Sequence, residues 1–419
     1  MRPSSQFQSR RGSRFNNNLE MPRKHKPDYI LLVIIILLLS IGLVVIYSIG
    51  PGLSINSGVG ANYFINRQMI SVILGLVGFA ITAFMPLKAW RRFEKPLIII
   101  SVIAALAVRV LGQEVNGAYR WIQIGGFSFQ ADELIKFALL IWLAGFLASQ
   151  IKSGAISDFK KTLLPIIMAL FIIGVVVAGV ESDLGTTAVM MAMMACMAFV
   201  ASVPMKKIAI FVGVIVACVV IAVATSSYRQ QRLATYLHPS SDCQNSGYQT
   251  CQALIAVGSG GILGLGLGNS VQAYGYLPES ANDSIFAIYA EKFGFLGTTI
   301  LLALFAALFV RLKNIIERCP NNFSRLLVTG IMTWLSVQAF INIGAMIGVI
   351  PLKGITLPFI SYGGTSIMFV MAALGIVFHI SRYTTYTVPT KITEGDDYDN
   401  SHYGRRLRGS RNPAISSRQ

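Results

Sequence analysis

Long apolar runs separated by short polar connections dominate this sequence. A helix crosses a hydrocarbon core with about 20 consecutive apolar residues, and windows of that kind recur along most of the chain. They lie at 29–48, 68–86, 96–111, 132–150, 162–180, 184–202, 207–226, 285–310, 325–348 and 363–382. Each run is continuous, whereas the strands of a membrane barrel alternate apolar and polar residues in short segments. The pattern predicts an all-α, polytopic membrane protein with ten transmembrane helices.

Composition and charge support this class and set the orientation. Hydrophobic residues make up 54% of the chain, charged residues 13%, and the mean hydropathy is +0.62. Such a chain carries more apolar surface than a soluble globule buries. Lysine and arginine gather before the first span and after the second, fourth, sixth and eighth, so these connections and both termini are predicted to be cytoplasmic. Topology and anionic lipid account for the net charge of +17, and we predict no nucleic-acid partner.

Three segments lie outside the spans. The connection at 227–284, between the seventh and eighth spans, is far longer than the others, so we expect a large functional loop on the exterior face. Within it, 248–257 is apolar enough to form a re-entrant or interfacial helix. Residues 1–28 and 384–419 lack apolar periodicity and are predicted to be disordered cytoplasmic tails. The predicted organisation is therefore one membrane domain, 29–383, between two tails.

Asp283 is the first candidate functional residue. It stands where the long exterior loop re-enters the membrane, and apolar residues follow at once from Ile285. A carboxylate at that depth is costly unless it pairs, meets water or takes part in chemistry. The simpler alternative is a helix cap, because Asn282, Asp283 and Ser284 have good capping composition. A capping role does not exclude a functional one.

Two charged pairs lie near the exterior ends of other spans. Arg120 and Trp121, in the connection 113–130, can hold an anion against an aromatic surface that also suits a sugar, or they can anchor the chain at the interface. Glu133 and Lys136 are three residues apart on one helical face. They form either a buried ion pair between helices or the lining of a water-filled cavity, with Lys136 available to a phosphate.

Further polar residues could complete an exterior site. Asp183 either caps the next helix or contributes to a polar vestibule, and Lys353 adds a cation in a loop punctuated by Pro and Gly. Gln338 and Asn342 are spaced to hydrogen-bond across helices from the ninth span.

The loop also holds a glycine-rich segment and two cysteines. The segment begins Ser259, Gly260, Gly261, and its backbone amides could cradle a phosphate, although close helix packing is the commoner use of such glycines. Cys243 and Cys251 lie in the same exterior loop, where an oxidising compartment permits a disulfide.

Five motifs together resemble the SEDS family, the shape, elongation, division and sporulation proteins. They are GAYRWIQIGGFSFQADELIK at 117–136, ESDLGT at 181–186, GYQTCQALIAVGSGGILGLGLGNS at 247–270, YLPESANDSIFA at 276–287 and PLKGITLPFISYGGTS at 351–366. The match runs from the first span to the tenth, and Lys353 followed by GITLP resembles the division branch more than the elongation branch. Asn282 and Ser284 depart from the family pattern on either side of Asp283.

The resemblance implies the SEDS fold and a peptidoglycan glycosyltransferase that polymerises lipid II on the exterior face of the bacterial cytoplasmic membrane, at the division septum. Asp283 is then the catalytic base. Arg120, Lys136 and Lys353 would supply positive potential for the pyrophosphate, while Trp121 positions a sugar and Glu133 orients Lys136. The implied partners are a class B penicillin-binding transpeptidase, other divisome proteins and membrane lipids.

A divalent cation, Mg²⁺ or Mn²⁺, is also implied by the resemblance, although no motif has the ligand spacing of a dedicated metal site. Three other functions remain open at the level of the sequence: a lipid II flippase, a non-catalytic divisome scaffold and an elongation-type polymerase. A flippase predicts a charge-lined path to the cytoplasmic side, whereas the polar residues here gather at the exterior ends of spans.

Overall fold

The computed structural model describes residues 25–115, 118–124, 127–174, 177, 183–225, 227–237, 243–245 and 247–384. They all lie in one compact unit, Met1–Thr385. Nearly all of the two predicted tails lies outside the described residues. The helices are α1 (Tyr29–Ser57), α2 (Tyr63–Phe84), α3 (Leu87–Leu111), α4 (Ala131–Lys152), α5 (Leu164–Ile173), α6 (Leu184–Val200), α7 (Met205–Ala224), α8 (Ser227–Leu237), α9 (Tyr248–Ser259), α10 (Ile285–Glu317), α11 (Asn322–Met346) and α12 (Gly364–Ser381).

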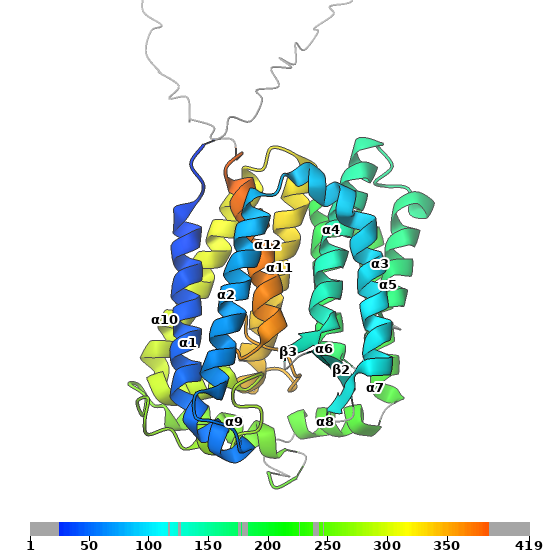
Figure 1. Ribbon diagram of the computed structural model, residues 1–419. Coiled ribbons are helices and arrows are strands. Elements are labelled where there is room, and N and C mark those ends of the chain that lie inside the picture. The colour runs from blue at the N-terminus through cyan, green and yellow to red at the C-terminus, as the bar shows by residue number, and fades with distance from the viewer. Residues whose placement is uncertain are drawn as a thin grey trace, which may run out of the picture. The chain divides into compact units, whose positions relative to one another are not determined.

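The prediction of a multi-pass, mainly helical membrane protein is confirmed. Within the described ranges, six helices are long and apolar enough to cross a membrane: α1, α2, α4, α10, α11 and α12. A π-helical turn, Phe159–Leu163, leads into α5, and α6 is a shorter apolar helix. Figure 1 shows the long helices running side by side.

The helices pack through small residues and apolar side chains. Helix α2 packs against α12, α3 against α4, and α11 against α4, α6 and α10. Glycines let two of these pairs approach closely, as expected for helices in a membrane. A Cβ at Gly375 would meet the backbone of Phe79, and one at Gly330 would lie 2.7 Å from the sulfur of Met197.

The two ends of the membrane domain meet at one end of the helices, here called the terminal contact and formed by residues 25–28, 381–384 and Arg311. The His25 amide donates to the Arg382 carbonyl at 2.9 Å, and the Asp28 amide donates to Ser381 Oγ at 3.1 Å. Asp28 also caps α1 through Leu31 and accepts from Arg311 Nη2 at 2.7 Å. The predicted tail boundary at residue 28 therefore falls inside an ordered contact.

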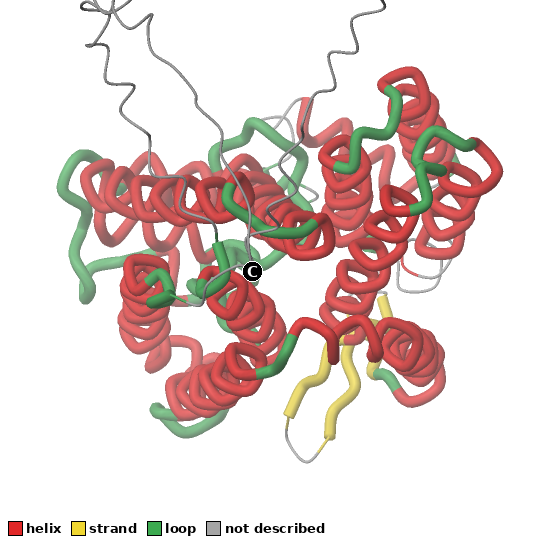
Figure 2. The backbone as a smooth tube through the Cα atoms, turned by 90° about the horizontal axis from the view of Figure 1, so that it is seen from above, coloured by secondary structure: helices red, strands yellow, loops and turns green. Residues whose placement is uncertain are grey.

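A small antiparallel sheet occupies the connection between α3 and α4, which corrects the all-α expectation. Its strands are β1 (Gln113–Val115), β2 (Ala118–Ile124) and β3 (Phe127–Gln130), in the order β1-β2-β3. The sequence AYRWIQI is rich in aromatic and β-branched residues, which favour strands, and Gly-Gly precedes FSFQ, a common hairpin turn. Viewed down the helices, the strands lie at the edge of the bundle (Figure 2).

The long connection between α7 and α10 is partly folded. It contains α8, α9 at the place where a re-entrant or interfacial helix was predicted, and a 3₁₀ turn, Gln272–Tyr274 (η4). Cys243 and Cys251 form a disulfide beside the start of α9. Figure 1 shows α8, α9 and the strands at the end of the helices opposite the start of α1.

Candidate functional site at the helix ends

Asp283 lies in a tight turn that leads into α10. The turn is closed by the Asn282 and Ser284 amides, which donate to the Glu279 carbonyl at 3.0 and 3.1 Å. Ser284 is the N-cap residue of the helix, so the capping position falls one residue after Asp283. The Asp283 side chain is only 8% exposed. A carboxylate is thus buried at the end of a membrane helix, as its sequence position predicted.

Asn342 joins Asp283 to two other parts of the fold. From the buried face of α11, its Nδ2 donates to the Asp283 carbonyl and to the Ile355 carbonyl, both at 2.7 Å. The amide is 1% exposed. One side chain therefore fixes the start of α10 against α11 and against the connection between α11 and α12.

That connection, residues 347–363, encloses Asp283 from the other side. Ser361 Oγ donates to the Asn282 carbonyl at 2.6 Å and accepts from the Leu357 amide at 2.7 Å. The Tyr362 amide donates to the Ala281 carbonyl at 2.8 Å. The backbone around Asp283 is therefore held by three elements, which limits its freedom to move relative to the helices.

A buried cation lies nearby on α4, linked to the same connection. Lys136 Nζ is 2.9 Å from Glu133 Oε2, and both side chains are 3% exposed. Lys136 also donates to Gln338 Oε1 at 3.3 Å and lies 5.0 Å from the ring centre of Trp334. Gln338 in turn donates to the Thr356 carbonyl at 3.0 Å. The predicted Glu133–Lys136 pair is formed, and Gln338 connects it to residues 347–363.

Lys353 and Asp183 lie near each other through α6. Asp183 caps this helix, accepting from the Thr186 amide at 3.0 Å and from its hydroxyl at 3.1 Å. A Cβ at Gly185 would lie 3.3 Å from the Cβ of Lys353 and 2.7 Å from Ile355, so the connection 347–363 rests on the first turn of α6. The capping interpretation of Asp183 accounts for its position, and Lys353 is half-buried beside it.

Trp121 and Arg120 lie on β2. Trp121 pairs with Gln130 across the sheet, and the Gln130 amide donates to Thr365 Oγ1 on α12 at 3.3 Å. The sheet is therefore attached beside the connection that surrounds Asp283, and Trp121 is half-buried there. The side chain of Arg120 lies outside the described residues.

Ser259, Gly260 and Gly261 pack against α10 rather than against the turn at Asp283. A Cβ at Gly260 would meet the Ala290 backbone, and the Gly261 carbonyl accepts from the Phe295 amide at 2.8 Å. These contacts begin about two helical turns beyond Asp283. Helix packing therefore explains this segment, and its described contacts do not bring it to Asp283.

Sequence reasoning missed one cation beside the turn. Arg67 on α2 lies 4.4 Å from the ring centre of Tyr63 and is hydrogen-bonded to the Tyr362 hydroxyl. Burial raises the pKa of Tyr362, and the Arg67 guanidinium partly offsets this rise. The neighbouring Gln68 donates to the Ser361 carbonyl at 3.3 Å. The available signal was the pair Arg67-Gln68 at the start of the second predicted span.

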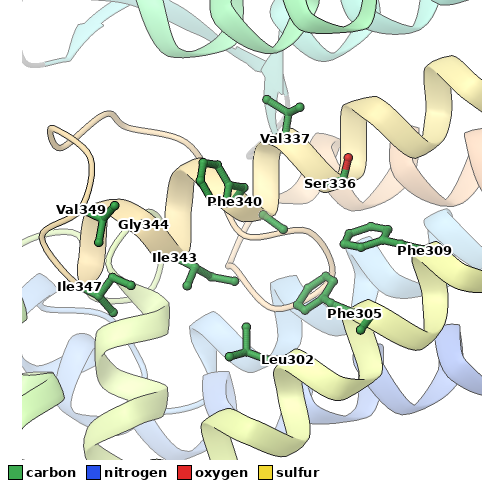
Figure 3. Close-up of a pocket in the computed structure, with 12 residues that line it drawn as sticks. Leu302, Phe305, Phe309, Ser336, Val337, Phe340, Ile343, Gly344, Ile347 and Val349 are labelled. Carbon is green, nitrogen blue, oxygen red and sulfur yellow. The ribbon is translucent and has the colours of Figure 1, made fainter. Parts of the chain in front are cut away.

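An apolar groove opens between α10 and α11. Its volume is about 540 Å³, and side chains from the two helices face each other across it (Figure 3). Phe305 and Phe309 line it from α10, and Phe340, Ile343 and Gly344 line it from α11. The groove presents almost no polar surface, so it suits an apolar helix or a hydrocarbon chain.

A resident metal has no evident cage in the part of the chain that the structure describes. There, no three His, Cys, Asp or Glu side chains come together. The acidic residues in the turn and on the elements packed near it include Asp283, Glu279, Asp132, Glu133 and Asp183. Glu133 pairs with Lys136, Asp183 caps α6, and the Glu279 carboxylate accepts from Asn282 Nδ2. These residues do not fit a dedicated divalent-cation site.

The fold and the site define a multi-pass α-helical membrane protein with a buried polar site at one end of its helices. A model of the FtsW, RodA and SpoVE family, described as "Cell cycle protein", matches residues 29–386. The chain belongs to this family, and the resemblance to the SEDS proteins is confirmed.

Named relatives and a solved structure extend this comparison. The chain is 35% identical over 367 residues to "Stage V sporulation protein E" of Bacillus subtilis, covering 87% of this chain and 99% of that protein. It is 34% identical over 362 residues to "Probable peptidoglycan glycosyltransferase FtsW" of Saccharophagus degradans, covering 84% and 92%. A structure titled "Structural coordination of polymerization and crosslinking by a peptidoglycan synthase complex" matches with a TM-score of 0.68 and 26% identity, covering 85% of this chain and 98% of that one.

Proposed function

We propose that this protein is a peptidoglycan glycosyltransferase that polymerises lipid II during cell division, with Asp283 as its catalytic base. Similarity to proteins named peptidoglycan glycosyltransferase FtsW supports the reaction and the division role. The observation that carries the assignment to Asp283 is its burial in a turn fixed by Asn342, Ser361 and Tyr362. A base held in this way can be aimed at one hydroxyl of a bound sugar.

In the proposed reaction, Asp283 acts as the base and nearby cations stabilise the leaving group. Asp283 accepts the proton from the attacking sugar hydroxyl as the new glycosidic bond forms to the anomeric carbon of the second sugar. The bond from that carbon to the pyrophosphate breaks, and the polyprenyl pyrophosphate leaves with the electron pair. Cations stabilise the negative charge of this leaving group, and we assign that role to Arg67, Arg120, Lys136 and Lys353.

The orientation proposed with this function places Asp283 on the exterior face. All ten predicted spans then cross the membrane, the connection 227–284 lies outside, and both termini lie in the cytoplasm at the division septum. The distribution of Lys and Arg among the connections supports this topology.

Replacing Asp283 with Asn tests the assignment directly. The amide keeps the shape and cannot take a proton, so the rate of lipid II polymerisation should fall by roughly 10²–10⁴-fold. Glycan length would be measured on gels with labelled lipid II and purified protein, with and without a cognate transpeptidase. Asp158→Asn is the matched control, because Asp158 also precedes a helical segment but lies beyond the other end of α4, away from Asp283. Equal rates for the two variants would remove Asp283 from the mechanism.

The competing functions give different results in the same preparation. A flippase would make no glycan but would move fluorescent lipid II across vesicle membranes. A scaffold would do neither, and Asp283→Asn would leave its association with the divisome unchanged. A divalent cation stays a prediction, tested by adding a chelator and restoring Mg²⁺ or Mn²⁺.

The groove between α10 and α11 is the surface we propose for the membrane helix of a class B transpeptidase partner. Small residues in its walls, Ala306, Ala339 and Gly344, permit close helix approach. Ala339→Trp would fill the groove and should reduce co-purification of the transpeptidase. Ile103→Trp, on an exposed face of α3, is the control and should leave co-purification unchanged. Equal recovery of the partner with both variants would place the interface elsewhere.

A further inference from the structure

Helix α10 is broken near its start. Gly294 has φ 63° and ψ −164°, far from helical values. In an unbroken helix the Phe295 and Leu296 amides would donate to the Glu291 and Lys292 carbonyls, four residues earlier. The break therefore frees two donors and two acceptors at membrane depth, where an unsatisfied backbone group costs several kcal/mol.

The glycine-rich segment 260–266, here called the inserted loop, takes up all four groups. Its bonds to the broken helix are Leu265 N to Glu291 O at 2.9 Å, Gly266 N to Lys292 O at 3.0 Å, Phe295 N to Gly261 O at 2.8 Å and Leu296 N to Ile262 O at 3.1 Å. Gly264 and Gly266 have φ of 82° and 85°, values that favour glycine. The loop thus replaces the helical bonds that Gly294 removes.

The two charged residues beside the break are also satisfied within the protein. Glu291 accepts from Ser270 Oγ at 2.5 Å and from the Val271 and Gln272 amides at 2.8 and 3.1 Å. Lys292 Nζ donates to the Leu267 carbonyl at 2.7 Å. Both side chains are 1% exposed. The charges at this depth therefore do not require water.

The position of the break sets the depth of the inserted loop. From Phe295 to Val310 the helix carries no charged residue, and Arg311 follows. These residues span about 24 Å of helix, close to the thickness of a hydrocarbon core of about 30 Å. The break and the loop bonded to it therefore lie at the boundary of that core.

Apolar side chains of the inserted loop continue the lipid-facing surface of α10. Ile262 and Leu263 are 74% and 77% exposed, and their neighbours on the helix, Phe295 and Leu296, are 70% and 54% exposed. No charged residue occurs between Ser259 and Gly268. Burying an aliphatic side chain of this size is favourable by about 1.5–3 kcal/mol.

We propose that the inserted loop is a re-entrant membrane element, in which Ile262 and Leu263 enter the acyl region of the bilayer leaflet nearest Asp283. The occupant of this surface is bilayer lipid, because the surface is continuous with the exposed face of a membrane helix. The loop would anchor the long connection 227–284 at a fixed depth, at a break that lies about three helical turns beyond the candidate base.

Depth-dependent fluorescence quenching tests this proposal without any measurement of activity. Leu263→Cys would be labelled with a small fluorophore in a protein whose Cys196, Cys218 and Cys319 are replaced by Ala, leaving the disulfide intact. The protein would be reconstituted without substrate into vesicles containing lipids with a nitroxide on the acyl chain. Phe295→Cys gives the reference for a lipid-facing site, and Ser153→Cys, in a cytoplasmic connection, gives the reference for water.

Quenching at position 263 within twofold of that at 295, and several-fold above that at 153, is the expected result. Because no polyprenyl substrate is present, such quenching comes from the bilayer alone. Quenching at 263 equal to that at 153 would overturn the proposal, whether water or another part of the protein covers the side chain. Position 263 is exposed, so labelling leaves the fold intact, and gel filtration with the quenching at 295 verifies that.

Discussion

At the scale of single residues, the contacts of Lys136 show how a charge is stabilised inside the helix bundle. Its ammonium contacts Glu133 and Gln338, and the face of Trp334 covers it. A buried ion pair contributes little net stability, but removal of one partner leaves the other charge uncompensated. The pair is therefore costly to break from either side.

Lys136→Met should destabilise the protein by about 3–5 kcal/mol, because Glu133 then remains buried without its counter-charge. The double variant Glu133→Gln with Lys136→Met should recover much of this loss. The thermal unfolding midpoint in detergent, followed by tryptophan fluorescence, measures both. If Lys136→Met is as stable as wild type yet inactive, Lys136 acts on substrate rather than in a structural pair.

Cys319, in the connection between α10 and α11, should react slowly with alkylating reagents. Burial raises the pKa of its thiol from 9.0 to about 12, and nearby Arg325 opposes the rise only in part. At pH 8 the thiolate fraction then falls about 10³-fold relative to an unshifted thiol. Labelling with iodoacetamide would be compared between a protein lacking Cys196 and Cys218 and the same protein with Cys319→Ala.

The pH dependence has a definite sign. The folded state holds the Cys319 thiol proton more tightly than the unfolded state does. The contribution of this thiol to the free energy of unfolding is therefore complete below pH 9 and is lost as the pH rises through about 12. Cys319 is half-buried, and labelling at pH 8 as fast as in denaturant would show that the fold does not shield its thiol.

Single residues were predictable where the membrane makes a polar group expensive. Asp283, Glu133 and Lys136 were found because charges in apolar runs are rare. Arg67 was missed, because an arginine at the end of a span is ordinary and its neighbour Tyr362 comes from the other end of the sequence. The packing of the turn at Asp283 could not be predicted, because its contacts come from α11 and the connection 347–363, which are distant in the sequence.

At the scale of elements, the break in α10 depends on one glycine. A Cβ at Gly294 would lie 2.6 Å from the Ile262 carbonyl, and its φ of 63° is unfavourable for alanine. The same Cβ would also meet the Gly264 amide nitrogen, and neither Ile262 nor Gly264 can move without breaking the hydrogen bonds of the inserted loop. The break in α10 therefore depends on two segments about 30 residues apart in the sequence, Gly294 and the inserted loop.

Gly294→Ala should lower stability by at least about 1–3 kcal/mol, the cost of holding alanine at positive φ. Gly258→Ala in α9 is the control, because a Cβ there meets nothing within 4 Å. It should leave the thermal midpoint unchanged or raise it slightly, since alanine favours helix. Equal midpoints for the two variants would mean that α10 can straighten without penalty.

The helical class was predicted because the apolar runs are long and continuous, and the count of ten spans stays a prediction. The sheet was not predicted. The strands are short, and AYRWIQI looks like an interfacial segment when the search is for membrane windows. The break at Gly294 was also missed, because the sequence from Ile285 to Val310 reads as one apolar run. The break is bonded to the inserted loop, which lies about 30 residues earlier, and a local sequence pattern cannot reveal such a contact.

At the scale of the whole molecule, the terminal contact joins the start of the membrane domain to its end. His25 bonds to Arg382, and Asp28 pairs with Arg311, so the start of α1 and the end of α12 lie on the same side of the membrane domain. This agrees with an even number of crossings. The Lys and Arg distribution predicts which of the two sides faces the cytoplasm.

Reporter fusions test that orientation. A fluorescent protein that folds only in the cytoplasm should be bright when attached after Thr384, and alkaline phosphatase should be active when inserted after Gly268. The reciprocal fusions should be dark and inactive. Activity of phosphatase at residue 384 would invert the proposed topology and move Asp283 to the cytoplasmic face.

The terminal contact also has a consequence for synthesis. Helix α2, made early, packs against α12, and residues 25–28 bond to residues 381–384. The bundle therefore stays open while the ribosome makes everything between them, and it can close only when residues 381–384 have emerged. A nascent chain stopped a few residues short of this point would hold nearly every helix and still lack its closing contacts, so cellular proteases should degrade it like a misfolded protein.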